Sequence, residues 1–130
     1  VYFRRASKGG EDGQPEFSLM LVGWGSGTGE ASSPLKSLLT THDKSKGHGA
    51  SNRGRHSDAK VDALVIKALA SVDDTRRAGL LAAATEKAIG ENQGIIPLHY
   101  QVNTWATRKG LSYSPRTDER TVATDLTPTK

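Results

Sequence analysis

Residues 17–30 read Phe-Ser-Leu-Met-Leu-Val-Gly-Trp-Gly-Ser-Gly-Thr-Gly-Glu, an apolar run that stops at a glycine-rich turn. An apolar run of this length that ends in glycine predicts a buried β-strand over 17–24. In open α/β sheets, ligands bind beyond the carboxyl ends of the strands, and glycine lets the backbone approach them closely. We therefore expect Trp24 to form one wall of a ligand pocket, because its ring offers a large apolar face.

Two amphipathic helices are predicted downstream of this strand. In the first, which Ser57 caps, apolar residues recur at the spacing of one helix face. The second begins after a cap at Asp73 or Asp74 and runs to about Glu91. Only about three residues join the two helices, so we expect an antiparallel hairpin. The apolar positions are Val61, Leu64, Val65, Ala68 and Leu69 in the first helix and Ala78, Leu81, Ala84, Thr85 and Ala88 in the second.

The other predicted elements are short. A Ser-Pro pair predicts the start of a short helix over 34–41. Apolar and polar residues alternate over 96–102, which predicts a half-buried strand, and Pro97 indicates an edge position or a bulge. Short extended pieces are expected within 111–126.

The domain organisation is predicted to be simple, with a single piece over 1–130. Residues 42–57 are polar and have almost nothing apolar to bury, so we expect a mobile surface loop there. The tail 127–130 is expected to be frayed. Because the sequence begins at Val1 with neither an initiator Met nor an apolar signal core, we expect a trimmed protein or a fragment.

The composition of the 130 residues is that of a globular protein, with 35% hydrophobic residues, a net charge of +4 and a pI near 9.5. The basic residues are scattered, whereas a nucleic-acid-binding protein usually gathers them on one face. The absence of cysteine excludes disulfides and thiolate chemistry. No apolar run approaches the roughly 18–20 residues that would span a bilayer.

Several charged residues are expected to have structural rather than ligand-binding roles. Arg76 and Arg77 are expected on a solvated face or in an ion pair between elements. Asp62 lies in the first turn of its helix, where a negative charge is favourable. The mixed signs of 116–120 predict pairing on the surface rather than phosphate binding.

The glycine-rich turn matches no catalytic or nucleotide-binding motif. It lacks both G-x-G-x-x-G and a Gly-Lys-Ser/Thr sequence. Around Ser26, a tryptophan and a threonine stand where the hydrolase motif G-x-S-x-G requires glycines. The four histidines, with His48 and His56 as the best pair, lack the spacing of metal ligands. We therefore expect no catalytic residue, no metal and no cofactor, and a binding module rather than an enzyme.

Four blocks in series resemble one family, the extracellular solute-binding proteins of the peptide and nickel type, which capture substrates for ABC importers. The strand and turn of 17–29 resemble a strand of the second lobe in this family. Residues 56–64 are similar to its helix start Tyr-Ser-Asn-Pro-x-Val-Asp-x-Leu. Residues 73–84 are similar to Asp-x-x-x-Arg…Leu-x-x-Ala, and residues 94–99 to a strand containing Ile-Pro-Leu.

The resemblance implies an α/β fold that is part of the second lobe of a two-lobed periplasmic-binding-protein fold, with a few strands and helices packed on them. It implies non-catalytic capture of a peptide or another small solute in the periplasm or elsewhere outside the cytoplasm. The expected partners are this ligand, the membrane subunits of the importer and the remaining lobe, with no nucleic acid. Trp24 would contact the ligand, and the amides of Gly25, Ser26 and Gly27 would donate hydrogen bonds to it.

Two departures from the family leave the ligand open. Gly27 stands where peptide-binding members carry an acidic residue that pairs with the ligand's amino group, and Leu21 stands where some carry an arginine. Glu30 is the candidate acidic replacement, and a solute other than a peptide is the alternative. Two further classes remain as alternatives, namely a small basic nucleic-acid-binding domain, which only the pI supports, and a hydrolase that uses Ser26.

Overall fold

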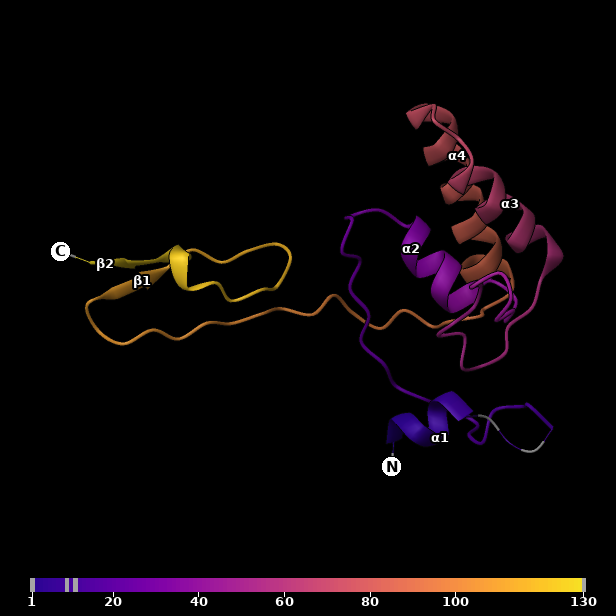
Figure 1. The fold of residues 1–130 in the computed structure, drawn as a ribbon, viewed down its shortest axis with the longest axis horizontal. Helices are drawn as coiled ribbons and strands as arrows, with labels where there is room; N and C mark the ends of the chain where they lie inside the picture. Colours follow the sequence, from indigo (N-terminus) through magenta and orange to yellow (C-terminus); the bar gives the residue numbers. More distant parts are fainter. Residues whose placement is uncertain (1, 9, 11, 130) are drawn as a thin grey trace. The chain divides into compact units, whose positions relative to one another are not determined.

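The computed structural model describes residues 2–8, 10 and 12–129, and the contacts of the chain fall into two compact units, Val1–Ile96 and Pro97–Lys130. The sequence had predicted a single piece. In the described residues the first unit is helical and the second contains a two-stranded sheet (Figure 1). This mixture of helices and strands is compatible with the expected α/β class.

The first unit is built from helices of different lengths, two of which continue into a π-helical turn. In chain order they are α1 (Tyr2–Lys8), α2 (Ser32–Pro34) with its continuation η1 (Leu35–Leu39), α3 (Ala59–Leu69), and α4 (Asp74–Thr85) with its continuation η2 (Glu86–Glu91).

The helices α3 and α4 form the hairpin that the sequence predicted, and they lie side by side (Figure 1). Asp73 caps α4 as expected, because its carboxylate accepts a hydrogen bond from the Arg76 amide at 2.6 Å. The cap of α3 is Asp58 rather than the predicted Ser57. Its carboxylate accepts from the amides of Lys60 at 2.7 Å and Val61 at 3.0 Å.

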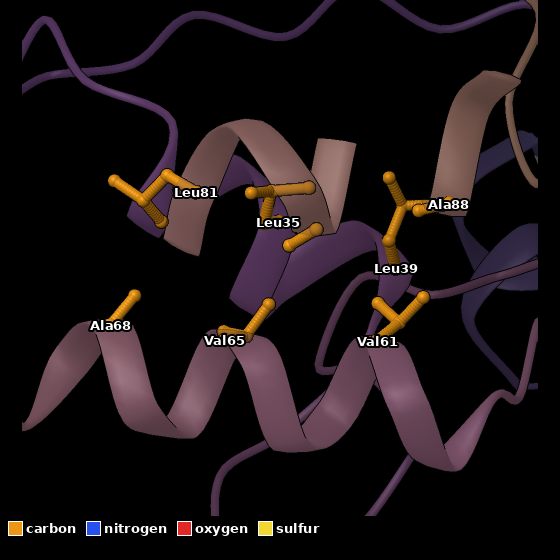
Figure 2. Packing of buried hydrophobic residues seen from close by; sticks show 8 residues of the cluster. Leu35, Leu39, Val61, Val65, Ala68, Leu81 and Ala88 are labelled. Atoms are coloured by element: carbon orange, nitrogen blue, oxygen red, sulfur yellow. The ribbon is translucent and has the colours of Figure 1, made fainter. Parts of the chain in front are cut away.

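One apolar cluster holds the first unit together. Its buried members are Leu35, Leu39, Val61, Val65, Ala68, Leu81, Ala84 and Ala88. Figure 2 shows Val61, Val65 and Ala68 along one side of α3, with the valines pointing toward Leu35 and Leu39 of η1 and the alanine toward Leu81 of α4. The small residues Ala84 and Ala88 are fully buried, as expected where α4 packs closely on its neighbours. Leu69 and Ala78, at the outer ends of the predicted stripes, are exposed.

The segment that follows η1 is secured by polar contacts. The Gly49 amide donates to the Thr40 hydroxyl at 2.9 Å, and the Asn52 side chain donates to the Thr40 carbonyl at 2.8 Å. Gly49 has a φ of +57°, and a Cβ there would lie 2.5 Å from the Thr40 carbonyl oxygen, so only glycine fits. The loop 42–57 is therefore bonded to the end of η1, while its mobility stays a prediction.

The helix formed by α2 and η1 differs from the predicted short helix at both ends. It begins at Ser32 and ends at Leu39, whereas the sequence predicted 34–41. Ala31 holds the N-cap position without a side-chain hydrogen bond. Pro34 fits inside the first turn because the amides of a first turn need no acceptor within the helix.

The predicted strands over 17–24 and 96–102 are wrong, because neither segment forms a strand in the structure. Leu19 and Leu21 are 84% and 73% exposed, where a buried strand was expected. A strand needs a neighbour that supplies main-chain donors and acceptors, and an apolar run cannot reveal whether one exists. Consequently η1, α3 and α4 pack on one another, not on a sheet as the expected lobe would require.

The second unit contains an antiparallel pair, β1 (Leu111–Tyr113) and β2 (Leu126–Pro128), with a 3₁₀ helix at Ala123–Asp125 before β2. These strands confirm the extended pieces expected near 111–126. Thr127 and Pro128, from the tail expected to be frayed, pair with β1, while residue 130 lies outside the described residues. Over the described ranges, no helix has both the length and the apolarity needed to cross a bilayer.

Two alanine substitutions should change the free energy of unfolding in opposite directions. A Cβ at Gly94 would lie 2.7 Å from His56 Cδ2 and 2.8 Å from Leu39 Cδ2. We expect Gly94→Ala to cost about 1–3 kcal/mol through overpacking. A Cβ at Gly79 on α4 meets no atom within 4 Å, so Gly79→Ala should stabilise the chain by about 0.5–1 kcal/mol. Urea unfolding followed by circular dichroism measures both, and changes of the same sign would contradict this packing.

Candidate functional site

The four predicted ligand-binding residues, 24–27, lie in an exposed turn rather than at the end of a buried strand. Trp24 is 43% exposed, so part of its ring is covered by the chain and the rest faces outward. A Cβ at Gly25 or Gly27 would meet no atom within 4 Å, so the space beside both glycines is open. The turn therefore presents an aromatic face and accessible backbone, without an enclosing pocket formed by the described residues around it.

The hydroxyl of Ser26 holds this turn closed. It donates to the Glu30 carbonyl at 2.8 Å and lies 3.3 Å from the Thr28 hydroxyl. The Gly29 amide donates to the Ser26 carbonyl at 3.3 Å, and Gly29 has a φ of +70° that suits glycine. Neither partner of the Ser26 hydroxyl is a base that could activate it as a nucleophile.

The sequence predicts that the main-chain amides of the turn donate hydrogen bonds to a ligand. In the part of the chain that the structure describes, the amides of Gly25, Ser26 and Gly27 donate no hydrogen bond to another group. Gly25 and Gly27 are exposed and Ser26 is half-buried, so water can satisfy these amides and an acceptor on a ligand could replace that water. Carboxylate and carbonyl oxygens are acceptors of this kind.

An ion pair fixes the far end of the turn to the helices. Arg77 Nη2 lies 2.9 Å from Glu30 Oε1, and Arg77 Nε lies 3.2 Å from Glu30 Oε2, so the pair is bidentate. Arg77 Nη1 also donates to the Ala68 carbonyl at 3.0 Å, at the end of α3. Arg77 therefore joins α4, α3 and the turn. Of the two interpretations of this arginine, the inter-element ion pair is confirmed, while Arg76 is exposed.

Glu30 is committed to this ion pair. The hydrogen bond from Arg77, assisted by one from the Ser32 hydroxyl, lowers the pKa of the Glu30 carboxyl. Both carboxylate oxygens accept from Arg77, and Ser32 donates to one of them as well. From the sequence, Glu30 is the candidate acidic residue for pairing with a ligand's amino group, since position 27 is glycine. To do so, Glu30 would have to give up its contacts with Arg77 and Ser32.

A second polar cluster links the loop, α3 and the residue after η2, and no local sequence pattern indicates it. His56 Nδ1 lies 2.8 Å from the Leu39 carbonyl, and the Asn92 amide donates to Asp58 Oδ2 at 2.8 Å. The Asn92 hydrogen bond, followed by that of the Val61 amide, lowers the pKa of Asp58. The cluster ties the start of α3 to the end of η2, so its role is structural.

The other candidate ligand sites are less developed. A depression of about 300 Å³ lies between α3 and the continuous helix formed by α4 and η2, and its lining contains none of the four predicted residues. It is lined by Lys60, Ala63, Leu64, Lys67, Ala83, Lys87 and Glu91. Within the described ranges, no group of three or more histidine or acidic side chains is placed to hold a metal ion.

Replacing Glu30 by glutamine should reduce the acid sensitivity of the fold. The pKa of Glu30 is lowered from its ordinary 4.5, so the ion pair stabilises the folded state above that value. This contribution is lost as the pH falls through the pKa of the folded state. Thermal melting between about pH 6 and pH 3 should show a smaller loss of Tm in Glu30→Gln than in the unsubstituted chain.

The matched control is Glu86→Gln, because Glu86 is exposed on η2. This variant should keep the full acid sensitivity of the unsubstituted chain. Identical melting curves for Glu30→Gln and Glu86→Gln across this pH range would contradict the role assigned to the ion pair.

Comparison of the chain with protein-family models, with curated proteins and with solved structures found no match.

Proposed function

We propose that this chain is part of the second lobe of an extracellular solute-binding protein of the peptide and nickel type, and that it binds a peptide or another small solute for an ABC importer. The observation that carries the proposal is the turn at 24–27, in which an exposed tryptophan stands beside three free amides. The sequence blocks that resemble this family support it. The remaining lobe and the membrane subunits of the importer would be its partners.

The chemistry of the turn indicates which part of a solute it recognises. The amides of residues 25–27 are donors, so they suit a carbonyl or carboxylate oxygen of the ligand. The face of Trp24 suits an apolar or flat group next to that oxygen. The turn offers no free carboxylate for a ligand's amino group, because residue 27 is glycine and Glu30 is paired with Arg77. A solute held by its oxygens, rather than by an ammonium group, fits this arrangement.

The anchoring of the turn supports a binding role over a purely connecting one. Preorganised donors lose less entropy on binding than donors on a freely moving loop. Here the Ser26 hydroxyl closes the turn from within, and the bidentate Glu30–Arg77 pair fixes it to the helical unit. In the proposed mechanism the remaining lobe closes over Trp24 by a hinge movement and shields the ligand from water.

In the complete polypeptide that contains this chain, Trp24→Ala should weaken ligand binding by about tenfold or more, as expected for a buried aromatic contact. Binding is measured by calorimetry with two probes, a library of short synthetic peptides and a panel of small carboxylates. Native mass spectrometry of the purified protein identifies any solute that it carries.

The control is Trp105→Phe in the same polypeptide. Trp105 stacks on Tyr113 at 5.7 Å and donates to the Thr121 hydroxyl at 3.0 Å, so its role is within the second unit. This variant should bind as the unsubstituted protein does. Unchanged affinity in Trp24→Ala would refute the assignment of Trp24, and an unsubstituted protein that neither carries nor binds any solute would refute the function.

A further inference from the structure

The depression between α3 and the continuous helix formed by α4 and η2 has an apolar floor. The floor is formed by Ala63, Leu64 and Ala83. Leu64 is half-buried and packs against the apolar cluster of the first unit, so the core holds the floor in place. Ala63 and Ala83 are exposed and leave the floor accessible. A volume of about 300 Å³ is at the lower end of the range of ligand pockets, so the depression suits a small ligand.

Three lysines surround this floor, and their charges are compensated to different extents. Lys87 is paired with Glu91, and the hydrogen bond between them raises the pKa of Lys87. The Lys87 side chain is only 23% exposed, so its aliphatic stem adds to the apolar surface of the depression. Lys60 and Lys67 are exposed, and neither forms an ion pair with a described residue. Two of the three positive charges at the depression are therefore unpaired within the described part of the chain.

The two unpaired lysines differ in their surroundings. They are seven residues apart on α3, which separates them by about 10 Å along the helix axis. Lys60 lies at the acidic end of the depression, because the Asp58 carboxylate accepts from its amide at 2.7 Å and also acts on the charge of Lys87. Lys67 lies two helical turns further along α3, away from this acidic end. The positive charge of the depression is therefore least compensated at Lys67.

We propose that this depression binds a small carboxylate that carries a hydrocarbon chain. The carboxylate pairs with Lys67, and the chain lies over the floor formed by Ala63, Leu64 and Ala83. The lysines decide the sign of the ligand's charge, because a cation would be repelled by them. The floor decides that the ligand has an apolar part, because an inorganic anion such as phosphate would leave the floor exposed to water.

The test uses three probes that separate the charge from the chain. They are octanoate, octylammonium with the same chain and the opposite charge, and acetate with the same head group and a single methyl. Binding to the 130-residue chain is followed by nuclear magnetic resonance shifts of the backbone amides of 60–67 and 83–91. We expect saturable binding of octanoate, tighter than that of either other probe by about fivefold or more. No saturable shift with octanoate, shifts confined to other parts of the chain, or equal affinity for all three probes would overturn the proposal.

A pair of charge-removing substitutions tests the role of Lys67. Lys67→Gln removes the charge assigned to the carboxylate and should weaken octanoate binding by about threefold or more. Arg76→Gln is the matched control, because it removes the same charge from an exposed residue of α4 that does not line the depression. The control should bind octanoate as the unsubstituted chain does. Equal affinities of the two variants would contradict the proposed ion pair.

Ala63→Glu provides a second measurement in which the fold is retained. The new carboxylate would stand four residues before Lys67, the spacing at which a glutamate and a lysine pair along a helix and stabilise it. It would occupy Lys67 and place a negative charge on the floor, so octanoate binding should weaken by about tenfold or more. Circular dichroism checks that the helices are retained, and unchanged octanoate affinity would overturn the proposal. The inference is independent of the proposed function, because none of residues 24–27 lines the depression.

Discussion

The packing of α3 against η1 and α4 is the contact on which the first unit depends. Val61, Val65 and Ala68 are fully buried along one side of α3, where they face leucines of η1 and α4. On α4, Ala84 and Ala88 are small enough to let the helices approach closely. Because this cluster provides most of the buried apolar surface of the unit, the loop and the turn can be polar and still hold a defined position.

Polar contacts extend this core to the parts of the first unit that have little to bury. Arg77 links the end of α3 to Glu30 beyond the glycine-rich turn. Thr40 and Asn52 hold the polar loop, and Asp62 of α3 accepts from the Thr41 amide at 2.8 Å. Buried polar groups need partners, and in this unit those partners come from segments that the apolar cluster already holds.

The candidate site at 24–27 is held by these polar contacts but is open to solvent. The turn at 24–27 is attached to a rigid unit at one end, through Glu30, yet nothing in the described residues covers Trp24 fully. Such a surface suits a ligand that a second lobe would enclose from the other side, as in the proposed function. The exposed segment at 96–104 resembles this turn in one respect, because its apolar side chains are uncovered and its main-chain amides are unpaired within the part of the chain that the structure describes. In both places the described residues leave apolar side chains and main-chain groups accessible.

The sequence by itself determined the helix hairpin, because helix periodicity, caps and a short connection are local properties of neighbouring residues. Val61, Val65, Ala68 and the Asp73 cap could all be predicted in this way. Tertiary structure alone decided the rest. Whether the apolar runs at 17–24 and 96–102 pair into strands depends on a neighbour that the local pattern does not encode. The partner of Arg77, the contacts of His56 and the exposure of Trp24 likewise depend on residues that are distant in sequence, and only folding brings those residues together.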